Sequence, residues 1–231
     1  PIAQVAKELK VAESSVVNFC KTIGFDGFKQ LKINLVKSLD NPEDLIYEDI
    51  NKDDSQQDVI KKVFSSSIRT LEESLQTIDM KQFSMAVDAI LKAKRIEFYG
   101  VGSSSTLAQD AYYRFMRIGL PVYAAVDPHI SRVSASNLDK DCLAIGISYK
   151  GRTIDTIETL KIAKRKGAKT MCITCFPLSP ITKTSDIKLI IPTSEAKIMR
   201  EAISSRIAQI ALIDSLYAVV ALKRFDTVAS H

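Results

Sequence analysis

Two turns rich in glycine and hydroxyl side chains offer the clearest chemistry in this sequence. Residues 100–106 read Gly-Val-Gly-Ser-Ser-Ser-Thr, and residues 148–153 read Ser-Tyr-Lys-Gly-Arg-Thr. Each turn follows an apolar run and precedes a segment with helical spacing, so unpaired helix amides should point out of it. Hydroxyls and such amides together suit a phosphate monoester, which needs several short donors for its oxygens. The alternative interpretation is that these hydroxyls only cap the helices.

Two further motifs indicate other sites less strongly. The pair Gly100 and Gly102 lacks the third glycine of a dinucleotide-binding fingerprint, and no lysine has the spacing of a nucleotide-triphosphate loop. Cys172 and Cys175 have the spacing of a metal or redox pair. Residues three apart on a strand face opposite sides, and no second pair is present, so we expect buried thiols and no metal. No cofactor is expected.

Acid–base chemistry has two candidates, His129 and Glu201. His129 has no identifiable partner, and a structural role is the more usual one for such a histidine. Nothing in the sequence places Glu201 near the two turns.

The elements that position the turns alternate between strand and helix patterns. The expected strands are residues 95–99, 121–125, 142–148, 170–174 and 187–191. This alternation predicts an α/β fold, with a parallel sheet of about five strands covered by helices on both faces. Turns that follow strands of one parallel sheet lie at the same carboxyl edge, where open α/β sheets bind ligands.

A helix expected at residues 58–78 carries an apolar stripe whose partner the sequence leaves open. The stripe consists of Val59, Val63, Phe64, Ile68, Leu71 and Leu75. Either the sheet domain or a second subunit could cover it. A long closing helix, residues 199–223, is apolar enough to be buried on more than one side.

Residues 2–9 and 15–23 predict two short helices joined by a tight turn. Gly24 occupies the C-cap position of the second helix. That helix should bury Val16, Phe19 and Cys20. It leaves polar and basic side chains outside, which we expect to face DNA: Ser14, Ser15, Asn18 and Lys21. The arrangement is typical of a helix-turn-helix, and the alternative is a pair of packed helices in any α domain.

Charge is distributed unevenly along the chain, whose formal net charge is +5. Residues 1–39 hold six lysines and three acidic residues, whereas residues 40–58 hold eight acidic residues and one lysine. The basic segment favours DNA contact, and the acidic block is typical of a solvated connector. Polar residues interrupt the longest apolar stretch, no secretory signal is apparent, and the cysteines indicate a reducing compartment. We therefore expect a cytoplasmic protein that does not enter a membrane.

The order of these motifs matches a family. The patterns Gly100-x-Gly102-x-Ser104 and Ser148-x-x-Gly151-x-Thr153 resemble the SIS (sugar isomerase) phosphosugar-binding domain. Residues 11–21, together with 23–25 and 27–28, resemble the DNA-reading half of RpiR/MurR-type regulators. The family signature also includes Asp127-Pro128-His129 and residues 205–209, so the resemblance covers nearly the whole chain.

The resemblance implies a bacterial transcription regulator without catalysis. Residues 1–39 would form a helix-turn-helix domain that lacks its N-terminal part, and residues 40–80 an acidic linker with a connecting helix. Residues 81–231 would form a SIS domain, a three-layer αβα structure around a five-stranded parallel sheet. The implied partners are a DNA operator, a sugar-phosphate effector and a second copy of the chain, in a homodimer or homotetramer.

The expected ligands of the sugar phosphate lie in the two turns: Gly102, Ser103, Ser104, Ser148, Lys150, Gly151, Arg152 and Thr153. Arg200 is a further candidate at the rim. The alternative function is a SIS-type isomerase, in which a glutamate or histidine base moves a proton. The helix-turn-helix favours the regulator, because an isomerase has no use for it.

The chain departs from the family pattern at three places. Lys150 stands where the family usually has a second serine, and Asn18 where the recognition helix usually has arginine. The family's helices upstream of Ile2 are absent, so this chain could fail to bind DNA even where a longer protein binds it. The ammonium of Lys150 could bind the phosphate, turn to water or occlude the pocket, and the sequence leaves these three open.

Overall fold

The computed structural model describes residues 2–22, 25–32, 50–51, 53–191 and 203–225. They divide into two compact units, one that reaches to Asp54 and one that begins at Ser55. The first contains helices α1 (Ile2–Leu9) and α2 (Glu13–Thr22), as the sequence predicts.

Helices α1 and α2 pack through a small apolar contact. Ala6, Val16 and Cys20 are buried there. The prediction that Phe19 is buried is wrong, since its side chain is 59% exposed. Val16 and Cys20 are one turn apart and face α1, and Phe19 lies to the side of that line. The predicted C-cap, Gly24, lies outside the described residues.

The second unit is built on five parallel strands in the order β2-β1-β3-β4-β5. The strands are β1 (Arg95–Tyr99), β2 (Val122–Ala124), β3 (Cys142–Ile147), β4 (Lys169–Thr174) and β5 (Ile187–Ile190). The predicted α/β fold with a five-stranded parallel sheet is confirmed, and β3 is buried along its whole length. Continuous burial follows from helices on both faces of the sheet.

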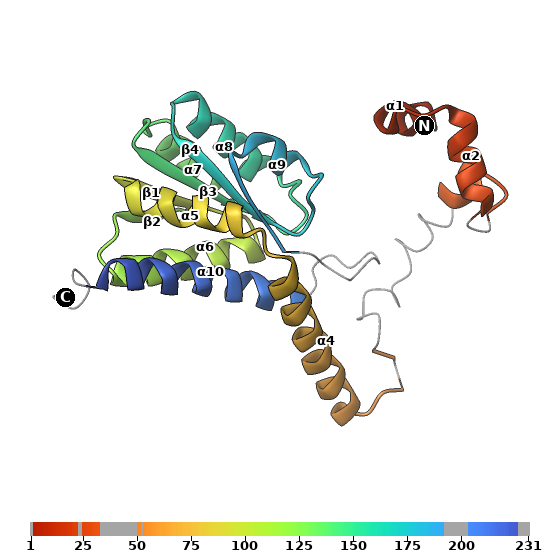
Figure 1. Cartoon of the computed structure of the whole chain (residues 1–231), viewed down its shortest axis with the longest axis horizontal. Coiled ribbons are helices and arrows are strands. Elements are labelled where there is room, and N and C mark those ends of the chain that lie inside the picture. Colours follow the sequence, from red (N-terminus) through yellow and green to blue (C-terminus); the bar gives the residue numbers. More distant parts are fainter. Residues whose placement is uncertain (1, 23–24, 33–49, 52, 192–202, 226–231) are drawn as a thin grey trace. The chain divides into compact units, whose positions relative to one another are not determined.

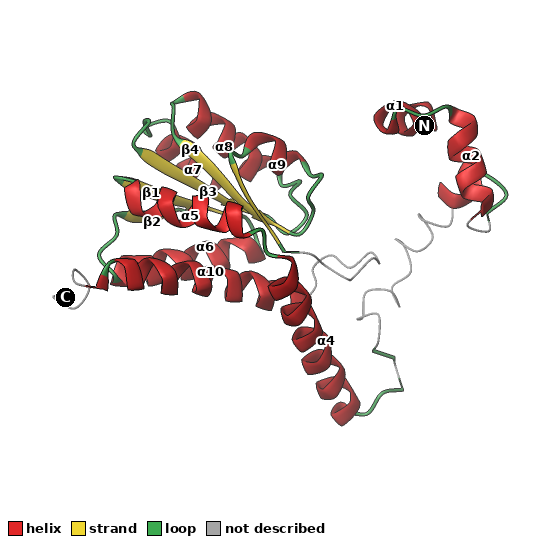
Figure 2. Cartoon of the chain, in the orientation of Figure 1, coloured by secondary structure: helices red, strands yellow, loops and turns green. Residues whose placement is uncertain are grey.

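Helices cover both faces of this sheet (Figures 1 and 2). One core cluster lies under α5 (Met80–Lys92), α6 (Ser103–Arg117) and α10 (Ile203–Lys223). The other lies under α7 (Pro128–Ala135), α8 (Ile154–Arg165) and α9 (Pro180–Thr184). The three layers place the starts of α6 and α8 on opposite faces of the sheet.

Helix α10 is long and apolar enough to span a bilayer by length and composition, and it is the one described helix that is. It packs instead against α4 (Gln56–Thr77), α5 and α6 within the second unit. Its buried side chains belong to the larger core cluster: Ala208, Leu212, Ile213, Leu216 and Val220. The apolar character of α10 is therefore explained by its place in the core, as expected for a helix buried on several sides.

Helix α4 meets α10 through small polar side chains. Ser67, Thr70 and Ser74 are buried, and the hydroxyls of Ser67 and Ser74 donate to the carbonyl oxygens of Val63 and Thr70. Most side chains of the predicted apolar stripe therefore do not hold α4 on the sheet domain.

Candidate functional site

The first turn leads from β1 into α6. Gly102 is the N-cap residue, with φ +63°, a conformation that favours glycine. The hydroxyl of Ser105 donates to the Gly102 carbonyl oxygen at 2.6 Å, and that of Thr106 donates to the Ser103 carbonyl oxygen at 2.7 Å. These hydroxyls bond to carbonyl groups, so they do not cap the first amides of α6. Ser104 is buried at the same turn.

The second turn leads from β3 into α8. The hydroxyl oxygens of Ser148 and Thr153 lie 3.0 Å apart. Thr153 is the N-cap residue of α8, yet its side chain makes no capping hydrogen bond. The interpretation that this hydroxyl only caps its helix is therefore wrong for Thr153. The start of α8 keeps amide groups that can donate to an anion.

Gly151 fixes the shape of the second turn. Its φ is +61°, and a Cβ at this position would lie 2.1 Å from Ser179 Oγ. Its amide donates to the Ser148 carbonyl oxygen at 3.0 Å, and its carbonyl accepts from the amide of Ile181 at 3.0 Å. Only glycine fits here without moving the neighbouring loop.

The two turns begin at the same edge of the sheet. Strands β1 and β3 are neighbours, and Tyr99 at the end of β1 is paired with Gly146 near the end of β3. From β1 the chain crosses to β2 on one side, and from β3 it continues to β4 and β5 on the other. This reversal of strand order is the position at which open α/β sheets bind ligands.

Two cations flank the second turn. Lys150 and Arg152 are both exposed. Sequence reasoning missed a further cation, Arg132 of α7, which forms an ion pair with Asp155 in the first turn of α8. The pair joins residues 23 apart in the chain, so no local pattern could have predicted it. It ties α7 to the helix whose start forms the turn.

Within the described residues, the structure does not bring the two acid–base candidates together. His129 is exposed in the first turn of α7, where Asp127 caps the helix by accepting from the amide of Ile130 at 2.8 Å. Glu201 and the rim candidate Arg200 lie outside the described residues.

The two cysteines of the predicted pair lie in different core clusters. Cys172 packs in the cluster under α7 and α8, and Cys175 in the cluster under α5 and α10. Both are free and buried, and burial raises the pKa of the Cys172 thiol to about 11. The prediction that they face opposite sides of the sheet is confirmed, so they do not form a metal or redox pair.

A buried carboxylate on β1 is a feature that sequence reasoning missed. Glu97 is fully buried and accepts hydrogen bonds from Tyr99 Oη at 2.5 Å and from Ser134 Oγ at 2.7 Å. Arg95 forms an ion pair with it at 2.6 Å. Burial, followed by the Glu97 charge, raises the pKa of Tyr99. This network links β1 to α7 and holds the strand that leads into the first turn.

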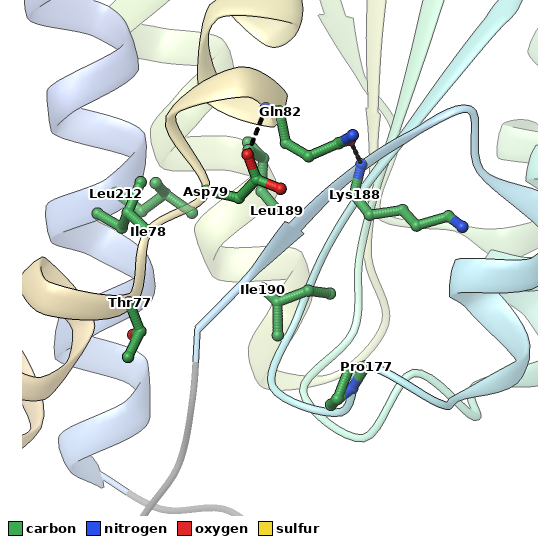
Figure 3. Close-up of a pocket in the computed structure, with 9 residues that line it drawn as sticks. All are labelled: Thr77, Ile78, Asp79, Gln82, Pro177, Lys188, Leu189, Ile190 and Leu212. Atoms are coloured by element: carbon green, nitrogen blue, oxygen red, sulfur yellow. Dashed lines mark hydrogen bonds between the residues drawn. The ribbon is translucent and has the colours of Figure 1, made fainter.

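A cavity of about 240 Å³ lies at the edge strand β5 rather than on the two turns (Figure 3). Asp79 and Gln82 of the α5 start line one side, and the Gln82 side-chain oxygen accepts from the Lys188 amide at 2.8 Å. Leu212 of α10 closes another side, and Pro177 belongs to the loop after β4. The cavity is therefore separate from the residues predicted to hold a ligand.

The outer face of α2 carries the four residues predicted to face DNA. Ser14, Ser15, Asn18 and Lys21 are all exposed, opposite or beside the buried Val16. Three of them, Ser14, Asn18 and Lys21, have the spacing of a single helix face.

Comparison with known proteins identifies both units. A model of the helix-turn-helix domain of the rpiR family matches residues 1–42, and a model of the SIS domain matches residues 89–219. The HTH-type transcriptional regulator RpiR of Escherichia coli K12 is 32% identical over 95% of this chain and 74% of its own length. The regulator HexR of Pseudomonas aeruginosa is 33% identical over 96% of this chain and 78% of its own length.

Solved structures share the fold at lower identity. The NanR protein of Vibrio vulnificus, solved in complex with ManNAc-6P, has a TM-score of 0.74 and 23% identity, over 99% of this chain and 83% of that one. A putative sugar-phosphate isomerase of Listeria monocytogenes has a TM-score of 0.66 and 20% identity, over 77% of this chain and 98% of that one.

Proposed function

This chain belongs to the rpiR family of helix-turn-helix transcriptional regulators that carry a SIS domain, and we propose that a phosphorylated sugar controls its binding to DNA. The observation that carries the proposal is the pair of helix starts at the switch point of the sheet. One is led by Gly102 and the other by Thr153, and neither residue caps its helix with a side chain. Two such starts supply backbone donors and favourable dipoles to one dianionic group.

In this proposal both turns contribute ligands to the phosphate. The hydroxyls of Ser148 and Thr153, already 3.0 Å apart, donate to two of its oxygens. Ser103 and Ser104 approach from the first turn, and the bends at Gly102 and Gly151 let backbone come close.

Lys150 and Arg152 add positive charge at the open side of the second turn, where both are exposed. A lysine that swings onto the phosphate forms a charge-assisted hydrogen bond, which is stronger than the hydroxyl contact it replaces. Of the three roles left open for Lys150, we therefore propose the ligand role.

The sugar would be a phosphorylated hexose or amino sugar. The Vibrio vulnificus relative of the same fold was solved with ManNAc-6P, which supports an effector of this class. The pocket beyond the phosphate decides which sugar is accepted.

DNA would be read by the outer face of α2. Ser14, Ser15 and Asn18 would contact base edges and phosphates, and Lys21 would contact phosphates. A regulator of this type reads a two-fold symmetric operator, which requires two copies of the chain. We place the protein in the cytoplasm, with residues 1–39 as the DNA-binding domain, residues 40–80 as the connector and residues 81–231 as the effector domain.

The second candidate is a sugar-phosphate isomerase, because the Listeria protein with the same fold is described as a putative one. We favour a protein without catalysis. Neither turn contains a carboxylate or a histidine, and His129 is exposed in the first turn of α7. Proton abstraction next to a carbonyl needs a base within hydrogen-bond reach of that proton.

A thermal-shift screen with phosphorylated and unphosphorylated sugars tests the proposal. An effector at 100 times its dissociation constant adds about 2.7 kcal/mol to the free energy of unfolding, or roughly 5 °C or more for a chain of this size. We expect shifts with hexose and amino-sugar phosphates only. Equal shifts with glucose and glucose 6-phosphate would contradict a phosphate site, and turnover of the bound sugar, seen by NMR, would establish the enzyme instead.

A further inference from the structure

Helix α4 leaves large apolar side chains uncovered within its own unit. Ile60, Phe64, Ile68 and Leu75 are 59%, 67%, 55% and 78% exposed. Their spacing places them on one side of the helix, in a single stripe. We call these four residues the α4 stripe. A continuous exposed stripe of this kind marks an interaction surface rather than a solvated helix face.

The helix that carries the stripe is well defined. Ser55 and Asp58 form a capping box at its start, in which the amide of each residue donates to the side chain of the other at 3.2 Å. The buried side chains of α4 are the small polar residues Ser67, Thr70 and Ser74, and only the partly buried Leu71 of the apolar side chains packs against the core cluster of α10, so the stripe stays open. In Figure 1, α4 projects from the layered body of the second unit.

We propose that the α4 stripe packs against the α4 stripe of a second copy of this chain, antiparallel and around a two-fold axis. The order of its residues is self-complementary. When the helix is reversed about a point between Ser67 and Ile68, Ile60 meets Leu75 of the second copy. Phe64 then meets the partly buried Leu71, and Ile68 lies beside the axis. An interface between identical copies requires this kind of match, because each residue meets its counterpart twice.

Charge favours the same orientation. Lys61 and Glu72 are both exposed and border the same edge of the stripe. The antiparallel arrangement brings Lys61 of each copy close to Glu72 of the other, whereas a parallel two-fold arrangement would place these two charges at different heights and on opposite edges of the contact. Exposed ion pairs add little affinity, but they select among orientations. The inference deepens the proposed function, since it names the surface of the homo-oligomer that a two-fold operator requires.

Sedimentation equilibrium of the chain tests the surface. We expect a dimer that Phe64→Glu and Ile68→Glu each weaken by roughly 30-fold or more, because each would bury a charge at the centre of the contact. The matched control is Val133→Glu on α7, where the side chain is 51% exposed but lies outside the stripe, and it should leave the dimer unchanged. A monomeric wild-type chain, or a dimer that responds only to the control, would overturn the proposal.

Cysteine cross-linking tests the orientation, since the four native cysteines are buried. Ile68→Cys should form a covalent dimer on oxidation. Ile60→Cys and Leu75→Cys should cross-link only when mixed, because 15 residues separate them, about 22 Å along the helix. Cross-linking of Ile60→Cys with itself would overturn the antiparallel arrangement.

Hydrogen exchange in the stripe variants identifies any other occupant. Loss of protection confined to α4 and its near neighbours in the second unit supports the contact with a second copy. Increased exchange in residues 2–22 would mean that the N-terminal unit covers the stripe, and would overturn the proposal. Sugar-phosphate shifts measured in the same variants separate the outcomes: normal shifts with a lost dimer support this interface, and absent shifts with an intact dimer count only against the effector site.

Discussion

The hydroxyl oxygens of Ser148 and Thr153 lie 3.0 Å apart, across a turn that begins at the end of β3 and ends at the start of α8. The contact needs the positive φ of Gly151 between them, because this bend returns the chain toward Ser148. The two hydroxyls are thus held together by the backbone before any ligand arrives. A site prepared in this way loses little conformational entropy on binding.

Removal of either hydroxyl should weaken the binding of sugar phosphates. We expect Ser148→Ala and Thr153→Ala each to raise the dissociation constant about tenfold, since a hydrogen bond to a charged group contributes about 1.5 kcal/mol or more. The double variant should lose less than the sum of the two changes, because the hydroxyls position each other. Calorimetry checks both. Ser215→Ala, which removes an exposed hydroxyl of α10, is the control and should bind normally.

Gly151→Ala should distort the second turn. The new Cβ would lie 2.1 Å from Ser179 Oγ, and φ would remain +61°. We expect a loss of about 1–3 kcal/mol in the free energy of unfolding, measured by urea titration, together with loss of sugar-phosphate binding. Adding Ser179→Gly should restore part of the stability, because it removes the contacts with Ser179 but leaves the backbone strain and the 2.8 Å contact with Ile181 Cγ2. In Gly27→Ala, where the Cβ would meet nothing within 4 Å, stability should hardly change.

Lys150→Ser tests the role of the lysine. If the ammonium binds the phosphate, the substitution should weaken sugar-phosphate binding by roughly tenfold or more and reduce its dependence on salt. Titrations at two ionic strengths measure both effects. Lys161→Ser, on the exposed side of α8, serves as the control for general charge. Tighter binding in Lys150→Ser would contradict the ligand role and indicate that the lysine blocks the pocket.

The two exposed residues Asn18 and Lys21 should act differently on DNA. Lys21→Ala should weaken binding to all sequences and lower the salt slope by about one, because it removes one phosphate contact. Asn18→Ala should instead relax the preference for the operator by about 1–3 kcal/mol per affected base pair. Fluorescence anisotropy with operator and random duplexes separates the two. An unchanged operator affinity in both variants would show that α2 is not the reading helix.

The sequence by itself determined the layered part of this protein. Alternating apolar runs and helical spacings located all five strands, because burial on both faces demands continuous apolar strands such as 142–147. Glycines beside hydroxyl residues located the two turns, since the positive φ angles at Gly102 and Gly151 are a local backbone requirement that glycine meets.

Only the tertiary structure decided which distant residues meet. The pair of Arg132 with Asp155 and the burial of Glu97 beside Ser134 join separate elements, and such contacts leave no periodic signal. The sequence alone left open which surface covers the apolar stripe of α4, because the hydrophobic effect is not directional and does not specify a partner. Helix α10 packs on the side of α4 that carries Ser67, Thr70 and Ser74, and this packing leaves Phe64 and Ile68 exposed. The prediction that Phe19 is buried was wrong for a similar reason. Helical spacing shows which side of a helix is apolar, but not how much of that side the neighbouring helix covers.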